Sequence, residues 1–276
     1  MHGGQVSGAP RTQVHPTAVV HPGAELGQGV RVDAYAVIGP GVRVGDRTVV
    51  KHHATIDGNT LIGCDCTIFP FSALGGDPQD VTFKGEETFA HIGDRNVIRE
   101  FTTFNRGTVK GGGHTRLGDD GYLMAYAHVA HDCQIGNHVI LSNNATLAGH
   151  VEIGDYAVLS AFCAVHQFVR IGRNAYIGGY SVVCQDILPY AKVAQSRESF
   201  SLYGPNAIGM MRTGHSREFI EIVKDIFRIL YHSDLNTTQA VQRIGEQHGG
   251  SEEARVITDF ISQTKRGILK NFRSDV

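Results

Sequence analysis

Aliphatic residues return at every sixth position over most of the chain. One run of these positions, called guide positions below, extends from Val14 to Leu74, and a second extends from Leu117 to Val183. Six is a multiple of the strand period of two, so these side chains share one face of an extended chain. A helix would scatter the same positions around its axis. The repeat therefore predicts short β-strands.

Two further features accompany the guide positions. Glycine often follows the guide residue, and a small or β-branched residue often stands four positions after it, as at Ala36, Thr48 and Ala54. This combination is the signature of a parallel β-helix built from hexapeptide repeats. Three hexapeptides form one coil of about 18 residues, and successive coils stack about 4.8 Å apart through β pairing.

Breaks in the repeat predict the domain organisation. Residues 14–195 form the β-helix, with irregular loops at 75–91 and 105–116, the second of which shifts the register by one. Residues 1–13 are expected to be a flexible lead-in. The spacing becomes helical after Pro189, so residues 196–276 are expected to form a small C-terminal α-helical domain. No Lys-Ser/Thr pair follows the Gly111–Gly113 run, which therefore predicts a flexible loop and not a phosphate site.

Composition removes several classes of protein. With 276 residues, a net charge of −2 and a pI near 6.7, the chain lacks the basic character of nucleic-acid or anionic-membrane binders. No apolar run approaches the ~20 residues of a membrane span, and the start of the chain lacks a secretory h-region. The odd number of cysteines, 5, favours a reducing compartment, and we expect a cytoplasmic protein.

The candidate chemistry lies mainly between Leu123 and Val151. No histidine between positions 14 and 183 occupies a guide position or the fourth position after one, so these imidazoles are expected to point outward. His131, His150 and His166 follow one another at intervals close to one coil, which predicts a column on one outer face. Asp132 directly follows His131 and could support an imidazole that acts as a base. Three cysteines occupy the fourth-follower position and are expected in the core, namely Cys66, Cys133 and Cys163.

Several longer segments carry a resemblance to a known family. The segments HVAHDCQIGNHVILSNNATLAGHV, AVHQF and RTGHSRE, with GGDPQD, IGDRNVIRE and NRGTVKGGG upstream, resemble the UDP-N-acetylglucosamine O-acyltransferases of lipid A biosynthesis. The resemblance runs from about Val14 to the C-terminus. It implies a left-handed β-helix, although parallel crossovers are generally right-handed. It also implies a cytoplasmic homotrimer with active sites between neighbouring chains and with no cofactor or metal. Such an enzyme moves a 3-hydroxyacyl group from acyl carrier protein to the 3-position of a UDP-linked glucosamine.

The resemblance also implies roles for individual residues. His131 corresponds to the general base, Asp132 to the residue that orients it, and the N–H of Gly149 to an oxyanion donor. Gly179 corresponds to a position in the acyl groove, where glycine favours a longer chain. The remaining correspondences are contacts to acceptor, nucleotide or pantetheine, at Asp80, His128, His150, His166, Gln167, Asn206 and Arg212.

Three departures from the family pattern leave the acceptor open. Thr82 stands where many relatives have lysine, Asn105 where many have histidine, and Ile208 where a glutamate is usual. These changes make a 3-amino sugar a second candidate beside the 3-hydroxyl acceptor. Two other classes also remain: a sugar N-acetyltransferase that uses acetyl-CoA, and a zinc-dependent carbonic anhydrase with ligands at His128, His131 and His150.

Overall fold

A computed structural model describes residues 11–196 and 199–272. The chain divides into two compact units, one formed by residues up to 126 with 130–132, the other by 127–129 with the residues from 133 onward. Most of the predicted lead-in lies outside the described residues, and Gln13 already belongs to the first strand. Within the described ranges, no helix has the length and apolar character required to cross a bilayer.

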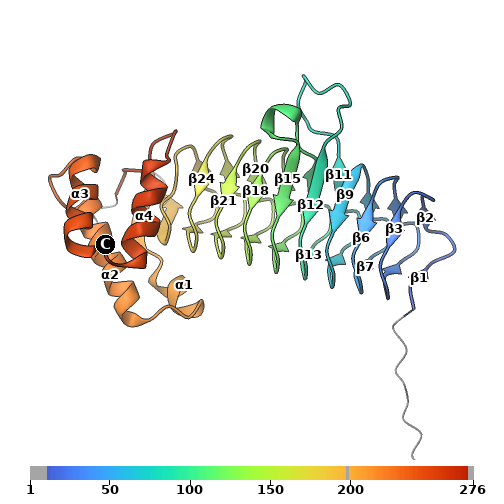
Figure 1. The fold of residues 1–276 in the computed structure, drawn as a ribbon, viewed down its shortest axis with the longest axis horizontal. Helices are drawn as coiled ribbons and strands as arrows, with labels where there is room; N and C mark the ends of the chain where they lie inside the picture. Colours follow the sequence, from blue (N-terminus) through green and yellow to red (C-terminus); the bar gives the residue numbers. More distant parts are fainter. Residues whose placement is uncertain (1–10, 197–198, 273–276) are drawn as a thin grey trace, which may run out of the picture. The chain divides into compact units, whose positions relative to one another are not determined.

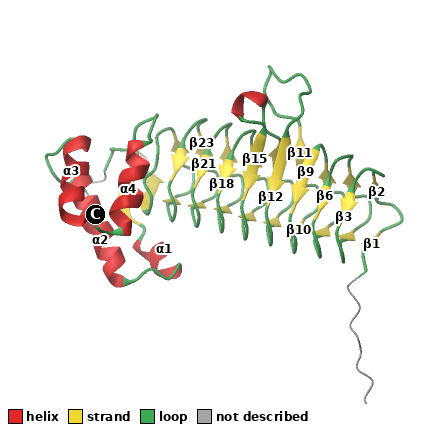
Figure 2. Cartoon of the chain, in the orientation of Figure 1, coloured by secondary structure: helices red, strands yellow, loops and turns green. Residues whose placement is uncertain are grey.

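The first unit consists of short parallel strands that repeat in three rows (Figures 1 and 2). Its strands are β1 (Gln13–Val14), β2 (Val19–Val20), β3 (Glu25–Leu26), β4 (Arg31–Val32), β5 (Val37–Ile38), β6 (Arg43–Val44), β7 (Val49–Val50), β8 (Thr55–Ile56), β9 (Asn59–Ile62), β10 (Thr67–Ile68), β11 (Ala73–Gly76), β12 (Phe89–Ile92), β13 (Val97–Ile98), β14 (Thr103–Asn105), β15 (His114–Leu117) and β16 (Tyr122–Leu123).

Strand pairing confirms the predicted coil of three hexapeptides and locates the two insertions. Val14 pairs with Val32, which stands three hexapeptides further along the chain. Ile62 pairs with Ile92, so this coil is longer by two hexapeptides, and the extra residues lie between β11 and β12. Ile92 pairs in turn with Leu117, so the next coil is longer by one hexapeptide and one further residue, between β14 and β15. The second insertion contains the short 3-10 helix η1 (Val109–Gly111), and Figure 1 shows both insertions leaving the same side of this unit.

Guide residues fill the interior of the coils. Ile38, Ile56 and Ile68 are fully buried, and the small residues four positions after guide positions are buried with them. Val14 is an exception, with 45% of its surface exposed, because β1 pairs with β4 only and the described chain has no coil on its other side. The cysteine prediction is confirmed: Cys66, Cys133 and Cys163 are buried, and burial raises the pKa of the Cys66 thiol to about 11.

The second unit continues the same strand pattern. Its strands are β17 (His128–Val129), β18 (Gln134–Ile135), β19 (Ile140–Leu141), β20 (Thr146–Leu147), β21 (Glu152–Ile153), β22 (Val158–Leu159), β23 (Ala164–Val165), β24 (Arg170–Ile171), β25 (Tyr176–Ile177), β26 (Val182–Val183), β27 (Ala191–Gln195) and β28 (Phe200–Pro205). Strands β27 and β28 pair antiparallel, an element that the helical spacing of this region did not predict. The hairpin ends the stack of parallel strands.

Up to residue 272, four helices follow the hairpin: α1 (Ala207–Arg212), α2 (Arg217–Tyr231), α3 (Thr237–His248) and α4 (Glu252–Ser262). Ser216 and Ser251 are the N-caps of α2 and α4, since each side chain accepts a hydrogen bond from the first turn of its helix. Figure 2 shows α2, α3 and α4 as one group beyond the last strands of this unit. Their shared core includes Val223, Ile244 and Ile257, all fully buried.

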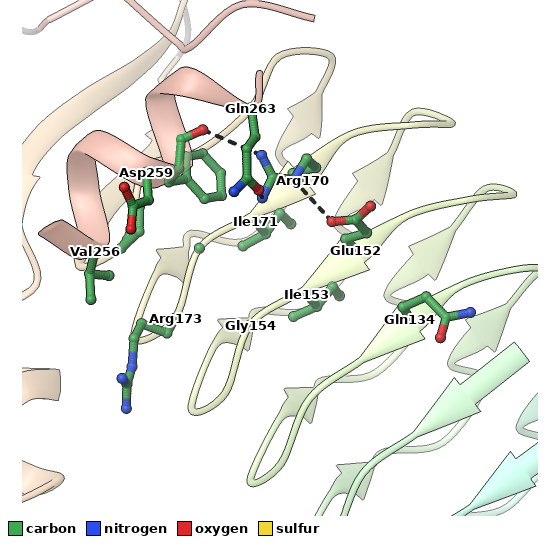
Figure 3. Close-up of a pocket in the computed structure, with 13 residues that line it drawn as sticks. Gln134, Glu152, Ile153, Gly154, Arg170, Ile171, Arg173, Val256, Asp259 and Gln263 are labelled. Carbon is green, nitrogen blue, oxygen red and sulfur yellow. Dashed lines mark hydrogen bonds and ion pairs between the residues drawn. The ribbon is translucent and has the colours of Figure 1, made fainter. Parts of the chain in front are cut away.

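Arg170 of β24 joins helix α4 to the coils of the same unit. Its guanidinium contacts Glu152 at 3.0 Å, donates to the Phe260 carbonyl and to Gln263 Oε1, and lies 4.5 Å from the centre of the Phe260 ring. Arg170, Glu152 and Gln263 line a hollow of about 390 Å³ that is formed by residues of β21, β24 and α4. Figure 3 shows these three side chains together.

Asp186 makes a second and more deeply buried connection. Its side chain is fully buried, with Oδ1 accepting from the Arg170 N–H at 2.9 Å and Oδ2 accepting from the Thr264 hydroxyl at 2.5 Å. Its backbone also bonds to Gly267 and Leu269. A buried carboxylate is stable only when donors such as these bind it, and the buried donors in turn would lack a partner without the carboxylate.

We therefore expect Asp186→Ala to lower the free energy of unfolding by about 2–4 kcal/mol, because two donors lose their acceptor in a buried site. Chemical denaturation followed by circular dichroism measures this change. Asp259→Ala, which removes an exposed carboxylate from α4, is the control and should change stability by less than about 0.5 kcal/mol. Equal stability of the two variants would contradict the role given to Asp186.

Candidate functional site

His131 and Asp132 form a hydrogen-bonded pair in the first unit. His131 Nδ1 lies 2.8 Å from Asp132 Oδ2, and only 15% of the His131 side chain and 1% of the Asp132 side chain is exposed. Because a carboxylate only accepts hydrogen bonds, Nδ1 carries the hydrogen, and Nε2 is the nitrogen that can accept a proton. Asp132 has the left-handed backbone conformation found at the corners of the coils, with φ of 63°.

The second insertion supplies two hydrogen-bond donors to the Asp132 carboxylate. The Thr108 N–H donates to Asp132 Oδ1 and the Thr108 hydroxyl donates to Oδ2, each at 2.7 Å. The Asp132 N–H donates to the Thr115 hydroxyl, also at 2.7 Å. The Gly111–Gly113 run, predicted to be a flexible loop, instead begins at the end of η1, where a Cβ on Gly111 would lie 2.0 Å from Asp132 Cγ. Glycine is therefore required at 111 by close approach to the carboxylate.

Asp80, another predicted site residue, lies in the first insertion. Asp80 Oδ1 accepts from both the N–H and the hydroxyl of Thr82, and these bonds, with the charges of Lys110 and His131, lower the pKa of Asp80. Lys110 of the second insertion donates to the Thr82 hydroxyl at 2.8 Å, so the ammonium reaches the position where many relatives have lysine. Asn105, at the end of β14, also binds the first insertion, since its amide nitrogen donates to the Asp77 carbonyl at 2.8 Å.

Other predicted site residues lie in the second unit. The ring of His150 stacks on Phe168, one coil further along, with centroids 4.4 Å apart. The residue that follows His150 by one coil is therefore Phe168, and His166 stands two positions before that corner. The column of His131, His150 and His166 stays a prediction. His166 and Gln167 are exposed, and His128 is half-buried on β17. The Gly149 N–H donates to no described residue, although the Gly149 carbonyl accepts from Phe168.

A groove of about 710 Å³ runs beside helix α1 in the same unit. Its lining combines an apolar floor on three strands with polar groups at the helix, and includes Ile140, Val158, Tyr176, Lys192, Asn206, Ile208 and Arg212. Arg212 is exposed at the end of α1. Asn206 has a structural role as well, since its amide caps α1 and donates to the Asn174 carbonyl. Gly179 is exposed in the turn that follows β25, where a Cβ would lie 3.2 Å from the Ala161 carbonyl.

The residues that support the His131–Asp132 pair were not predicted from the sequence. Thr108 and Lys110 occupy an insertion where the repeat gives no direction for a side chain, and Thr115 lies at a buried position of β15. The only available signal was the insertion itself, since a polar segment inside a regular repeat commonly carries function.

Family models match three segments of the chain. Residues 23–58 and 114–149 match the model for bacterial transferase hexapeptide repeats, and residues 186–269 match the second domain of UDP-N-acetylglucosamine O-acyltransferases. The acyl-[acyl-carrier-protein]–UDP-N-acetylglucosamine O-acyltransferase of Thermodesulfovibrio yellowstonii is 43% identical over 94% of this chain and 99% of its own length. The enzyme of that name from Syntrophobacter fumaroxidans is 45% identical over 94% of this chain and its entire length.

Solved structures extend the similarity to the fold. UDP-N-acetylglucosamine acyltransferase from Francisella novicida superimposes with a TM-score of 0.91 at 36% identity, covering 94% of each chain. The Bacteroides fragilis enzyme superimposes with a TM-score of 0.89 at 40% identity, covering 94% of this chain and all of its own. The predicted left-handed parallel β-helix with a C-terminal helical domain is thus confirmed. Similarity of this extent over nearly the whole chain shows that the chain belongs to the UDP-N-acetylglucosamine O-acyltransferase family.

Proposed function

We propose that this protein transfers a 3-hydroxyacyl chain from acyl carrier protein to the 3-hydroxyl of UDP-N-acetylglucosamine, the first step of lipid A biosynthesis. The observation that carries the proposal is the His131–Asp132 pair, with its carboxylate buried and fully hydrogen-bonded. The named relatives, 43% and 45% identical, carry the same activity in their names.

In this mechanism His131 is the general base. Asp132 keeps the hydrogen on Nδ1, so Nε2 takes the proton from the sugar 3-hydroxyl as that oxygen attacks the thioester carbonyl. The new C–O bond gives a tetrahedral intermediate, whose oxyanion accepts the hydrogen bond of the Gly149 N–H. The C–S bond then breaks, and the proton held by His131 passes to the departing thiol of acyl carrier protein. Atoms and charge balance without a metal or a cofactor.

The other assigned residues bind the substrates in this proposal. Asp80 accepts hydrogen bonds from the acceptor sugar, which its lowered pKa suits because the carboxylate stays ionised at neutral pH. Arg212 in the groove beside α1 offers a charged fork for a phosphate of the nucleotide or the pantetheine arm. His128, His150, His166, Gln167 and Asn206 complete the contacts to the two substrates, and Gly179 lines the acyl groove.

We also propose that the protein acts as a homotrimer in the cytoplasm, as the family resemblance implies. The composition supports this location, since the odd cysteine number and the buried thiols suit a reducing compartment. The alternatives of a 3-amino acceptor and of acetyl transfer from acetyl-CoA are not retained, because the named relatives are O-acyltransferases that use acyl carrier protein.

His131→Ala should reduce kcat by at least about 100-fold, because it removes the general base. The thermal midpoint should fall only modestly, since Asp132 keeps both hydrogen bonds from Thr108 when the imidazole is removed. Acyl transfer from 3-hydroxyacyl carrier protein measures the first change and calorimetry the second. His21→Ala, which removes an exposed histidine of the same unit, is the matched control and should keep full activity. Undiminished acyl transfer by His131→Ala would remove this residue from the mechanism.

Metal analysis of the wild-type protein is a separate test. Stoichiometric zinc would favour the carbonic anhydrase alternative.

Gly179→Met should shift the preferred donor to a shorter acyl chain by about tenfold or more in kcat/KM, because the new side chain occupies the acyl groove. Competition between 3-hydroxyacyl carrier proteins of different lengths measures this preference. Gly250→Met is the control, because a side chain there meets open space in the helical region. An unchanged preference in Gly179→Met would show that another position limits the chain.

A further inference from the structure

The hydroxyl group of Thr108 has only one arrangement of its hydrogen that satisfies its neighbours. The Gly111 N–H donates to Thr108 Oγ1 at 3.2 Å, where the threonine caps η1. The same oxygen lies 2.7 Å from Asp132 Oδ2. An N–H and a carboxylate face one hydroxyl, so the oxygen accepts from the first and its hydrogen goes to the second. The hydroxyl hydrogen is thereby directed at Asp132.

Thr108 also controls the orientation of the carboxylate plane. Its N–H binds Oδ1 while its hydroxyl binds Oδ2, so a single residue contacts both oxygens. Oδ2 is shared with His131 Nδ1 at 2.8 Å. A carboxylate fixed at both oxygens cannot rotate about its Cβ–Cγ bond without losing a charge-assisted hydrogen bond. The direction of the His131 ring therefore depends on Thr108 through Asp132.

Burial makes this dependence strong. Asp132 is 4% exposed and Thr108 is 5% exposed, so water does not substitute for a lost partner at little cost. Gly111 adds a steric limit, because a Cβ there would lie 2.0 Å from Asp132 Cγ. The insertion between β14 and β15 thus holds the N–H and the hydroxyl of Thr108 in contact with the Asp132 carboxylate.

We propose that Thr108 is a positioning residue for the base His131: its N–H and hydroxyl fix the Asp132 carboxylate, which in turn aims His131 Nε2 at the acceptor hydroxyl. This inference rests on the proposed function of His131. It assigns a catalytic purpose to the second insertion, which otherwise only interrupts the repeat. Thr108 itself touches neither substrate in this account.

The test compares Thr108→Val, which removes the hydroxyl and keeps the shape, with Thr108→Ser, which keeps the hydroxyl. We expect Thr108→Val to lower kcat about 10- to 100-fold. This loss is a part of the ~10²–10⁴-fold rate enhancement that a general base supplies. The KM values for both substrates should change less than about twofold. Thr108→Ser should retain kcat within about threefold of the wild type. Gly111→Ala should lower kcat as Thr108→Val does, because it displaces the same carboxylate.

Thr48→Val is the matched control for the loss of a buried hydroxyl. Thr48 is fully buried in the same unit, donates to the Gly63 carbonyl at 2.8 Å and accepts from the Cys66 N–H at 3.0 Å, so its valine variant also loses one oxygen acceptor and one backbone donor. We expect a lower thermal midpoint for both valine variants but a kcat loss for Thr108→Val alone. Equal kcat in Thr108→Val and Thr48→Val would overturn the proposal.

A double-mutant cycle separates action through Asp132 from a general disturbance. If Thr108 acts through that carboxylate, Thr108→Val should lower kcat no further in an Asp132→Asn background. Additive losses would overturn the proposal. Failure of the proposed function is a distinct result, because then the wild type itself would transfer no acyl chain, or His131→Ala would transfer it at the wild-type rate.

Discussion

Pairing between strands one coil apart is the interaction on which the rest of this molecule depends. Val14 pairs with Val32 in the first unit and Leu147 pairs with Val165 in the second, in each case three hexapeptides further along the chain. Because the side-chain period of a strand is two, a slip of one residue would exchange the buried and exposed faces. The continuous interior of aliphatic side chains prevents that slip. The outward side chains of the paired strands and corners consequently have fixed directions, and His131 is one of them.

This constraint explains where irregular sequence is tolerated and what it does. Additional residues can be accommodated only at a corner, where they leave the coil and return in register, as Ile62, Ile92 and Leu117 show by pairing across both insertions. The inserted residues are free of the repeat, so they can carry polar groups back to the coil surface. Asp132 shows the result: a carboxylate buried at a corner has its hydrogen bonds supplied by an insertion. Buried carboxylates are stable only with such partners.

The sequence predicted the features that follow from periodicity. The guide positions and the buried cysteines, such as Cys66, appear where the spacing places them. Adjacent residues also allowed the prediction that Asp132 supports His131. The sequence did not predict that His150 stacks on Phe168, because the histidines suggested a column of their own. The strand β28 was missed as well, since an antiparallel hairpin at the end of the stack lies outside the hexapeptide pattern.

The supporting contacts of the site were beyond sequence reasoning for a physical reason. Thr108 contacts Asp132 across 24 positions of sequence, and an insertion gives no periodic guide to such a contact. The contact between Lys110 and Thr82, which joins the two insertions, was equally unpredictable. It places an ammonium group at Thr82, where the family pattern has a lysine. Long-range polar contacts of this kind depend on loop conformation, which a single sequence specifies only through the complete fold.

The central claim is that this site forms an ester at the sugar 3-hydroxyl with an acyl group taken from acyl carrier protein. The most direct measurement is a single-turnover reaction of the wild-type protein with a 3-hydroxyacyl carrier protein and UDP-N-acetylglucosamine, followed by mass spectrometry and NMR of the product. Our account predicts one 3-hydroxyacyl chain in ester linkage at the 3-position, released together with free carrier thiol. An unmodified sugar with this donor, together with acetylation of a sugar amine from acetyl-CoA, would contradict it.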